Sequence, residues 1–331
     1  MTLSPHPIVP WTADEVAKTL RAYGLGEPID IQAEDGWDCG RARCRVRTAS
    51  GEWFVKKHHP AVVRREAHAV VAAFRARGGL APEVMALPDG ATWYDAPGGD
   101  VVEVQRLVPG MAPGVASDEV ALAAMAQVAI LHGLSVDLVP RGLRGWYDLA
   151  EYVAVGTKVV ERFRAVGLPT DEIAALVAEE AAGIPWAGDD ALIHGDLWRC
   201  NWVADEGRIA ALTDFDYVHR SGRLDDVCDV ILAFCSERDT AYGALPFIAP
   251  PAVVAGPRAA AMLAAYERAR GPLSPQERAA LPAVLRSQWF RHRIGVLDDA
   301  RDEREFHEFR AAAERLLMAR RVVEGICAAI R

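Results

Sequence analysis

The sequence predicts an α+β fold of two lobes, with a small mixed-sheet lobe at residues 1–107 and a mainly helical lobe at residues 108–331. Short alternating or apolar runs, which are typical of strands, gather before residue 108. Beyond it, apolar residues recur at helical spacing. The dipeptide Pro109-Gly110 separates the two patterns and predicts a turn at the boundary. A chain of 331 residues is long enough to give each lobe its own core.

In the small lobe, Thr12 and Glu15 form a capping-box pattern, which predicts a first helix that ends near Tyr23. Alternating runs on both sides of Ala49-Ser50-Gly51 predict a β-hairpin. A short glycine-containing turn precedes this hairpin at residues 35–40. The elements expected here are a helix at 12–23, strands at 43–48 and 52–57, a helix at 62–77, and strands at 82–87 and 101–107.

In the helical lobe, Ser117 begins a segment with apolar residues at helical spacing, which ends at His132-Gly133. Ser274 and Glu277 form a second capping box around Pro275, a residue favoured at the first helical position. The expected helices are residues 117–132, 147–166 and 171–182, one that begins at 274, and an amphipathic one at 302–330.

Composition excludes several classes of protein. A net charge of −9 argues against a nucleic-acid partner bound through a broad basic face. No apolar stretch approaches the ~20 residues of a membrane span. The first residues lack the basic and apolar regions of a signal peptide. The six cysteines include no C-x-x-C pair and no zinc-site spacing, so reduced thiols and a cytoplasmic protein are expected.

The most informative motif is His194-Gly195-Asp196-Leu197-Trp198-Arg199-Cys200-Asn201, which is followed by Asp214-Phe215-Asp216 after an apolar run. Asp196, Asn201 and Asp214 provide a carboxylate, an amide and a second carboxylate in a fixed order. Phosphoryl transfer from a nucleotide uses these groups, because one Asp accepts the proton of the attacking hydroxyl while an Asn and a second Asp hold magnesium ions. The alternative is a turn that Asp196 caps and Asn201 closes. We favour phosphoryl transfer because the combined motif is rare at ordinary residue frequencies.

Lysine usage gives independent support. Of the 37 basic residues only four are lysines, and two of them, Lys56 and Lys57, end a strand-like run. Strand alternation aims these two at opposite faces of a sheet. Glu66 follows on the next predicted helix, and a strand Lys held by a helix Glu is the other half of a kinase nucleotide site. Two solvent-exposed lysines at a strand end are the alternative.

These motifs resemble the signature of the aminoglycoside phosphotransferase and choline kinase superfamily, which has a protein-kinase-like fold. The resemblance covers roughly residues 30–295. It implies that Asp196 is the catalytic base and that Asn201 and Asp214 bind Mg²⁺. Of the two lysines, it favours Lys56 as the one that contacts the phosphates of ATP, and Asp226 resembles the family residue that braces the catalytic loop. The loop Asp196–Asn201 and the segment Gly271–Arg278 are most similar to the homoserine-kinase branch.

The same resemblance suggests further site residues. The segment at 102–110 resembles the hinge whose backbone pairs with adenine, so Gln105 and Leu107 are expected at the nucleotide together with Glu66. Trp198, Asp216 and Tyr217 are candidates for the wall of the acceptor site. Because this fold serves amino alcohols, antibiotics, sugars and protein hydroxyls, the fold does not choose the acceptor.

The sequence therefore predicts an ATP-dependent O-phosphotransferase that uses Mg²⁺ and acts on the hydroxyl of a small molecule such as an amino alcohol or an antibiotic. Residues 1–107 would bind the nucleotide, and residues 108–331 would provide the catalytic loop and acceptor site. A Ser/Thr kinase of a protein or biosynthetic peptide and a nucleotide-binding scaffold without turnover remain alternatives. The choice between ATP and GTP stays open, as does a homodimer.

Overall fold

The computed structural model describes two compact units. The first comprises residues 1–111, 203–205 and 210–216, and the second residues 112–202, 206–209 and 217–331. Within them, the described residues are 11–34, 41–60, 63–114, 116–143, 149–167, 170–182, 191–237, 253–254, 256–298, 328 and 330. The glycine-containing turn expected at 35–40 lies outside these residues, and so does most of the final helix expected at 302–330.

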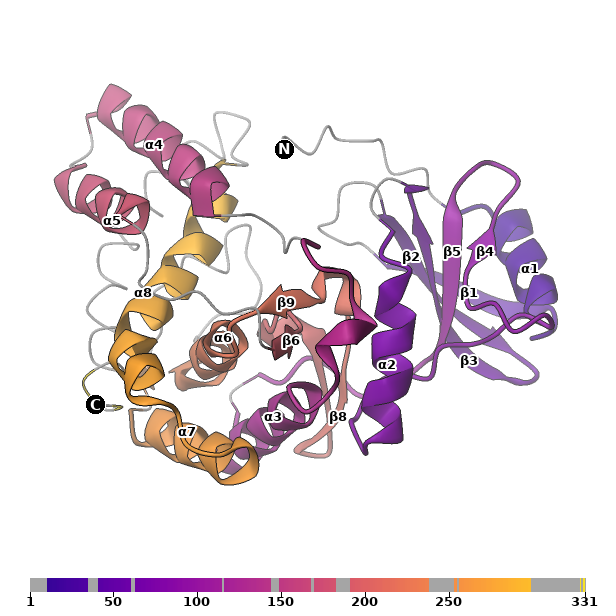
Figure 1. Ribbon diagram of the computed structural model, residues 1–331. Helices are drawn as coiled ribbons and strands as arrows, with labels where there is room; N and C mark the ends of the chain where they lie inside the picture. The colour runs from indigo at the N-terminus through magenta and orange to yellow at the C-terminus, as the bar shows by residue number, and fades with distance from the viewer. Residues whose placement is uncertain are drawn as a thin grey trace. The chain divides into compact units, whose positions relative to one another are not determined.

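The first unit contains a five-stranded sheet in the order β1-β2-β3-β5-β4, and two helices flank it (Figure 1). Every strand pair in it is antiparallel, so the prediction of a mixed sheet was wrong. The α+β fold class itself is confirmed. The elements are α1 (Ala13–Ala22), β1 (Pro28–Glu34), β2 (Arg41–Thr48), β3 (Gly51–His58), α2 (Glu66–Ala76), β4 (Tyr94–Asp95) and β5 (Val101–Arg106).

Local sequence explains most of these elements. The capping box is present, because the Thr12 side chain accepts from the amide of Glu15 and the Glu15 carboxylate accepts from the amide of Thr12. The β2–β3 hairpin pairs Thr48 with Gly51, as the turn sequence predicts. Residues 82–87 do not form the expected strand, and Val84 makes only an isolated bridge to β5.

The two faces of this sheet differ in polarity. One face carries Trp53 and Val55 of β3 and packs with Val16 and Leu20 of α1 in the core of the unit. The other face carries Lys56 of the same strand, since successive strand residues point to opposite sides. The expectation that alternation separates Lys56 from Lys57 is confirmed. Strand alternation therefore places Lys56 on the face opposite the apolar core residues Trp53 and Val55.

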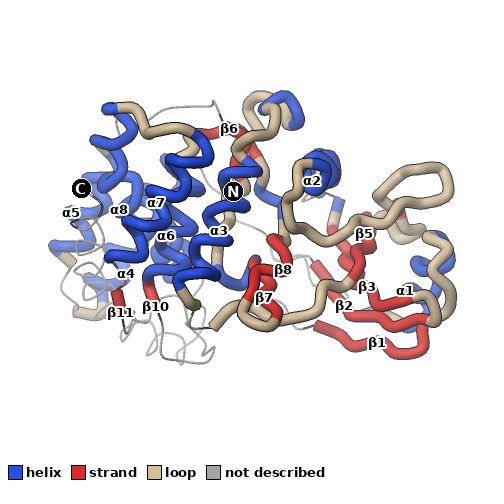
Figure 2. The backbone as a smooth tube through the Cα atoms, turned by 90° about the horizontal axis from the view of Figure 1, so that it is seen from below, coloured by secondary structure: helices blue, strands red, loops and turns tan. Residues whose placement is uncertain are grey.

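The second unit is mainly helical (Figure 2). Helix α3 contacts α6 and α7, and α6 contacts α8. The cap predicted for α3 is present, since the Ser117 hydroxyl accepts from the amide of Val120. The capping box at Ser274 and Glu277 is present as well. The helices are α3 (Asp118–Leu131), α4 (Leu149–Ala165), α5 (Asp171–Ala181), α6 (Leu224–Cys235), α7 (Gly256–Arg270) and α8 (Pro275–Asp298).

Short strands surround the motif identified in the sequence. Strand β6 (Ala191–Ile193) pairs antiparallel with β9 (His219–Ser221), and β7 (Trp202–Asp205) pairs with β8 (Arg208–Leu212). A 3₁₀ turn at Arg199–Asn201 separates β6 from β7, and another at Phe215–Tyr217 follows β8. The two acidic motifs therefore each follow directly on a strand. Across the described part of the chain, no helix is long and apolar enough to cross a membrane.

Candidate active site

Three charged side chains lie next to one another on the polar face of the sheet. Strand register places Arg43 of β2 directly opposite Lys56 of β3, and Lys56 directly opposite Glu103 of β5. Directly opposed residues share a face of the sheet, with Cβ atoms about 5 Å apart. Pairing three antiparallel strands thus creates a row of two cations and one carboxylate.

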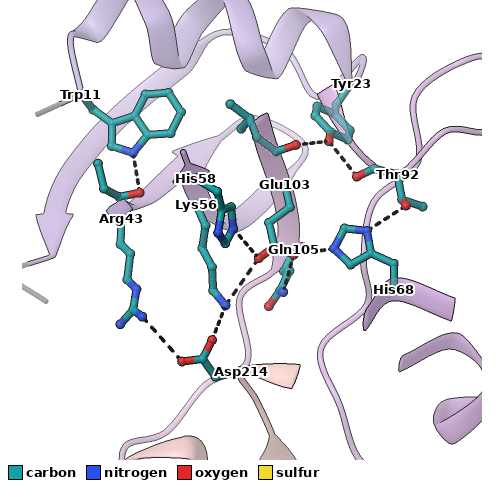
Figure 3. A network of polar contacts seen from close by, with 12 residues as sticks. Trp11, Tyr23, Arg43, Lys56, His58, His68, Thr92, Glu103, Gln105 and Asp214 are labelled. Carbon is teal, nitrogen blue, oxygen red and sulfur yellow. Dashed lines mark hydrogen bonds and ion pairs between the residues drawn. The ribbon is translucent and has the colours of Figure 1, made fainter. Parts of the chain in front are cut away.

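Lys56 is buried and forms two ion pairs. Its Nζ atom lies 3.0 Å from Oδ1 of Asp214 and 3.4 Å from Oε1 of Glu103. Burial alone would lower the pKa of Lys56, but the charges of Asp214 and Glu103 outweigh it and raise the pKa. The ammonium group is therefore charged, and it is held between two carboxylates (Figure 3).

Glu103 is only 2% exposed and accepts hydrogen bonds from three further side chains. His58 approaches Oε1 at 3.1 Å, while His68 and Gln105 approach Oε2 at 2.6 and 3.0 Å (Figure 3). Burial works against the charged form of Glu103, yet Lys56 and the hydrogen bonds from the histidines hold its pKa well below the usual range. Glu103 is thus an ionised carboxylate inside the unit.

Asp214 has a backbone conformation that is uncommon for a residue with a side chain. Its φ of 65° lies in the left-handed region, which Asp and Asn tolerate better than most residues. The carboxylate lies 3.5 Å from Nη2 of Arg43 in addition to its contact with Lys56. Backbone strain of this kind is concentrated at functional sites, where surrounding contacts maintain it. Here two cations hold the strained residue.

A cavity in the first unit brings these groups together. It contains four of the sequence-predicted site residues, Lys56, Gln105, Asp214 and Asp216. Its lining consists of Lys56, Ala67, His68, Val71, Pro82, Glu103, Gln105, Thr213, Asp214, Phe215 and Asp216. A charged lysine and three carboxylates thus surround one pocket.

Lys57 lies on the other face of the sheet and has different neighbours. Its Nζ atom is 3.3 Å from Oε1 of Glu15 and stands over the ring of Trp11. Its side chain is only 7% exposed, so the alternative of two solvent-exposed lysines was wrong for both residues. Lys57 connects β3 to α1 and is not part of the cavity lining.

In the second unit, the Asp-x₄-Asn spacing closes a short loop on itself. The side-chain amide of Asn201 donates to both the backbone oxygen and Oδ2 of Asp196, each at 2.8 Å. Both residues are buried, with 7% of their surfaces exposed. Asn201 therefore fixes the position of the Asp196 carboxylate, and its amide nitrogen is committed to that contact.

Asp226 of α6 holds the beginning of the same loop. Its carboxylate accepts from the backbone amides of His194 at 2.7 Å and Gly195 at 2.9 Å, and from Nε2 of His132 at 3.1 Å. Burial opposes its charge, but these donors lower the pKa of Asp226. The neighbouring Asp225 instead binds Ser221 and Gln288. The contacts identify Asp226, as expected, as the residue that braces the loop.

Glycine is required at the centre of the His194-Gly195-Asp196 turn. Gly195 has a φ of 77°, and a Cβ atom there would lie 2.9 Å from the carbonyl oxygen of Tyr217 and from Cε1 of His219. Any side chain would therefore combine backbone strain with a collision. This geometry explains the Gly of the motif.

The remaining predicted residues lie in different places. Trp198 is half-buried, and its backbone oxygen accepts from the amide of Asn201, which places it within the loop of Asp196 and Asn201. Tyr217 is half-buried, and its carbonyl accepts from His219. Asp216 is buried in the cavity with Lys56. The assignment of these three residues to the acceptor site stays a prediction.

Two predicted nucleotide residues do not join the cavity lining. Glu66 begins α2, and the ion pairs of Lys56 among the described residues are with Glu103 and Asp214. The expected Lys56–Glu66 contact is thus replaced by one to a strand residue. The amide of Leu107 donates to the carbonyl of Glu52, which extends the β3–β5 pairing by one residue. The roles of Glu66 and Leu107 at the nucleotide stay predictions.

Sequence reasoning did not identify Glu103, His58, His68 or Arg43. One signal was present, because Glu103 interrupts the apolar run Val101-Val102-Glu103-Val104 of a buried strand. A charged residue in such a run is rarely buried without a partner. The partners themselves come from three other elements, and their pairing depends on strand register.

The comparisons with known proteins place this architecture among the kinase-like phosphotransferases. The chain is similar to spectinomycin phosphotransferase in complex with ADP and spectinomycin, with 12% identity and a TM-score of 0.64 over 97% of this chain and 99% of that one. It is also similar to an aminoglycoside phosphotransferase from Alicyclobacillus acidocaldarius, with 14% identity and a TM-score of 0.60 over 91% of each chain. The predicted fold is confirmed.

A further similar structure is the macrolide 2′-phosphotransferase of Brachybacterium faecium, with 15% identity and a TM-score of 0.54 over 90% of this chain and 97% of that one. No curated protein matches the chain. The model of the phosphotransferase enzyme family matches residues 33–250, and the chain belongs to this family. It is a phosphotransferase, as the sequence motifs predicted. The likeness to the homoserine-kinase branch stays a prediction.

Proposed function

We propose that the protein transfers the γ-phosphate of ATP to a hydroxyl of a small molecule, with Asp196 as the base. The observation that carries this proposal is the closed loop in which Asn201 holds the Asp196 carboxylate at 2.8 Å. A fixed, buried carboxylate can orient an acceptor hydroxyl and accept its proton. Phosphoryl transfer asks little covalent work of the protein, so positioning and electrostatics supply most of the rate.

In this proposal Lys56 contacts the phosphates of the nucleotide. A buried ammonium acts as a strong point charge beside phosphate oxygens because few water molecules screen it. The lysine is already charged and oriented by Glu103 and Asp214. Binding of a phosphate would therefore need no new ionisation of Lys56.

Asp214 and Asn201 are the proposed ligands of Mg²⁺. A carboxylate and an amide oxygen are the hard ligands that this ion prefers, and phosphate oxygens complete such sites. Because the Asn201 nitrogen donates to Asp196, the amide oxygen is the atom that Asn201 can offer. Bound Mg²⁺ supplies neutralisation of the phosphate charge.

The acceptor class we favour is a hydroxyl-bearing amine or antibiotic. Support comes from similar structures that bind spectinomycin and, in another case, hygromycin B. At sequence identities of 12% and 13%, the similarity to these structures shows the shared fold, and a direct test identifies the acceptor. The protein's net charge of −9 suits a cationic acceptor.

The test has two parts. Calorimetry compares ATP binding with Mg²⁺ and with a chelator, and we expect tighter binding with the metal in the native chain and no metal dependence in Asp214→Ala. A transfer assay with labelled ATP then screens aminoglycosides, macrolides, amino alcohols and Ser/Thr peptides. Equal affinity with and without Mg²⁺ would remove the metal assignment. If a phosphopeptide is the only product, the protein is a Ser/Thr kinase and the small-molecule acceptor is wrong. If ATP binds but no hydroxyl is phosphorylated, the protein is a nucleotide-binding scaffold and not a catalyst.

A further inference from the structure

The position of Glu103 on its strand gives it a fixed relation to Lys56. The two residues are direct partners in the β3–β5 register, so the sheet itself sets the distance between their backbones. The Lys56 Nζ atom lies 3.4 Å from Oε1 of Glu103. Because β3 and β5 are central strands of the sheet, neither can shift without breaking pairing on both sides.

The Glu103 carboxylate has a full set of hydrogen-bond and ion-pair partners. Lys56 and His58 approach Oε1, and His68 and Gln105 approach Oε2. A carboxylate offers about four lone-pair positions, so the four contacts occupy them. A carboxylate held in this way has one orientation, and it transmits that orientation to the ammonium of Lys56.

Helix α2 reaches this carboxylate through a histidine. Nδ1 of His68 forms a hydrogen bond with the Thr92 hydroxyl at 2.8 Å, and Nε2 contacts Glu103 at 2.6 Å. The imidazole ring stacks on Trp93, with ring centroids 3.8 Å apart. Contacts on three sides fix the imidazole. His68 therefore links the helix to the strand carboxylate.

Glu66 lies at the edge of the buried face of the same helix. Its side chain is half-buried, and its neighbours one turn on are the exposed Ala69 and the buried Val70, whereas His68 is buried. Its place in the first turn is one that a helix favours for an acidic residue, whatever its other contacts. Glu66 therefore has a sufficient local explanation as a helix-terminal acid.

We propose that Glu103, a strand residue, positions Lys56 for the nucleotide phosphates, and that His68 is the residue through which α2 supports it. This inference rests on the proposed nucleotide-binding function. In the proposed reaction Asp214 turns to the metal, which leaves Glu103 as the carboxylate that keeps the Lys56 ammonium in place. The sheet then orients the lysine, and the helix steadies it through an imidazole.

The test compares matched Glu→Gln variants by calorimetry with Mg·ATP, which needs no knowledge of the acceptor. We expect Glu103→Gln to weaken Mg·ATP binding roughly 10- to 100-fold, the range for losing a hydrogen bond to a charged group. The exposed Glu83 contacts Arg106 at the surface, so Glu83→Gln is the control for the chemical change itself. Glu66→Gln measures the competing assignment. A loss with Glu66→Gln and none with Glu103→Gln would overturn the proposal.

A double-mutant cycle removes the contribution of any general destabilisation. Combined with Lys56→Met, Glu103→Gln should add little further loss of affinity, because the two residues act as a unit. Full additivity would overturn the proposal. If Glu103→Gln lowers the melting temperature below the assay range, the His68 variants decide. His68→Gln keeps a donor toward Glu103 and should retain most of the affinity, whereas His68→Leu should lose roughly tenfold. Equal affinity in both would contradict the proposal.

Failure of the proposed function would look different. If the native chain does not bind Mg·ATP at all, the nucleotide site itself is wrong, and the inference about Glu103 falls with it. If the native chain binds Mg·ATP and only the pattern among the variants differs, the proposed function stands and the assignment of Glu103 fails.

Discussion

Glu103 in the first unit and Asp226 in the second are both buried, ionised carboxylates, yet they are stabilised by different kinds of donor. Glu103 is contacted by side chains, namely Lys56, two histidines and a glutamine. Asp226 instead accepts from the consecutive backbone amides of His194 and Gly195, with one histidine in addition. The identity of several residues specifies the first network, whereas the path of the chain specifies most of the second.

This difference has a consequence for function. A carboxylate bound to backbone amides fixes a loop, and the side chains of that loop can then change without loss of the contact. A carboxylate bound to side chains fixes one charged group, and any of its partners can be altered separately. We therefore expect substitutions at Asp226 to disturb structure and activity together, and substitutions around Glu103 to act mainly on Lys56.

The largest effect should come from Asp196→Asn, which keeps the structure of the loop but removes the carboxylate that is proposed to accept the proton. Asparagine keeps the size of the side chain and an oxygen that can still accept from Asn201, but it cannot take up the acceptor proton. We expect the transfer rate to fall about 10²–10⁴-fold, with ATP affinity and melting temperature close to native. A transfer assay, an ATP titration and a thermal melt on one preparation measure all three. Unchanged transfer would exclude Asp196 as the base.

Asp226→Asn should have the next largest effect, and on stability as well as activity. One carboxylate oxygen becomes an NH₂ group, which faces a backbone amide that has lost its acceptor. We expect a loss of about 3–5 kcal/mol in the free energy of unfolding, because the buried donors remain while their charged acceptor is removed. Urea denaturation measures it. Asp225→Asn is the matched control on the same helix turn, because Asp225 is contacted by side chains that can reorient. An equal loss in both variants would remove the distinction between backbone and side-chain donors.

Lys56→Ala and Lys57→Ala sharpen the comparison within the first unit. Lys56 lies in the cavity, so its removal should weaken ATP binding roughly 10- to 100-fold. Lys57 pairs with Glu15 on the opposite face, so its removal should change ATP affinity by less than about twofold. Because the Lys57 side chain is only 7% exposed, we expect a loss of about 1–3 kcal/mol in stability. Calorimetry and a thermal melt of both variants provide the comparison. A loss of ATP affinity in Lys57→Ala but not in Lys56→Ala would mean that the nucleotide binds at the face that carries Lys57.

The smallest effect concerns Glu277, whose carboxylate combines both kinds of donor. It accepts from the Arg223 guanidinium and from the backbone amide of Ser274. The hydrogen bonds from Arg223 are the main cause that lowers the pKa of Glu277 from 4.5 to about 2. Because the folded-state pKa lies below the unfolded one, this stabilisation is complete above pH 4.5 and is lost as the pH falls toward 2.

We expect Glu277 to contribute at most about 3 kcal/mol to the free energy of unfolding at neutral pH, and this contribution should decline with acid. Glu277→Gln removes the titration but keeps a side chain that suits the capping box. Unfolding free energies of both proteins between pH 5 and pH 2 test the point. The difference between them should shrink with acid, and a difference independent of pH would contradict the assignment.

Much of the fold followed from local sequence signals. The capping boxes at Thr12 and Ser274 determine helix starts through contacts that span three residues, and the structure has both. The hairpin around Ala49-Ser50-Gly51 was equally local. The segment at 82–87 was predicted as a strand and forms only one bridge, because an apolar run does not reveal whether a neighbouring strand has space to pair with it.

The candidate site could be predicted where its functional residues lie close together in the sequence. The spacing of Asp196 and Asn201 indicated one loop, and the structure closes that loop with two hydrogen bonds. Strand alternation correctly separated Lys56 from Lys57. The sequence also suggested Glu66 as the partner of Lys56, since kinases take that carboxylate from the helix. In the structure the partners of Lys56 are Glu103 and Asp214.

By itself, the sequence determined the helix starts at Thr12, Ser117 and Ser274, the hairpin around Ser50, and the placement of Lys56 and Lys57 on opposite faces of one strand. These properties depend on caps, turns and strand alternation, whose contacts lie within a few residues. Only the tertiary structure decided that Glu103, and not Glu66, lies beside Lys56, and that His58 and His68 hold it. The physical reason is strand register. Residues 56 and 103 become neighbours only when β3 pairs with β5, and no contact within either strand carries that information.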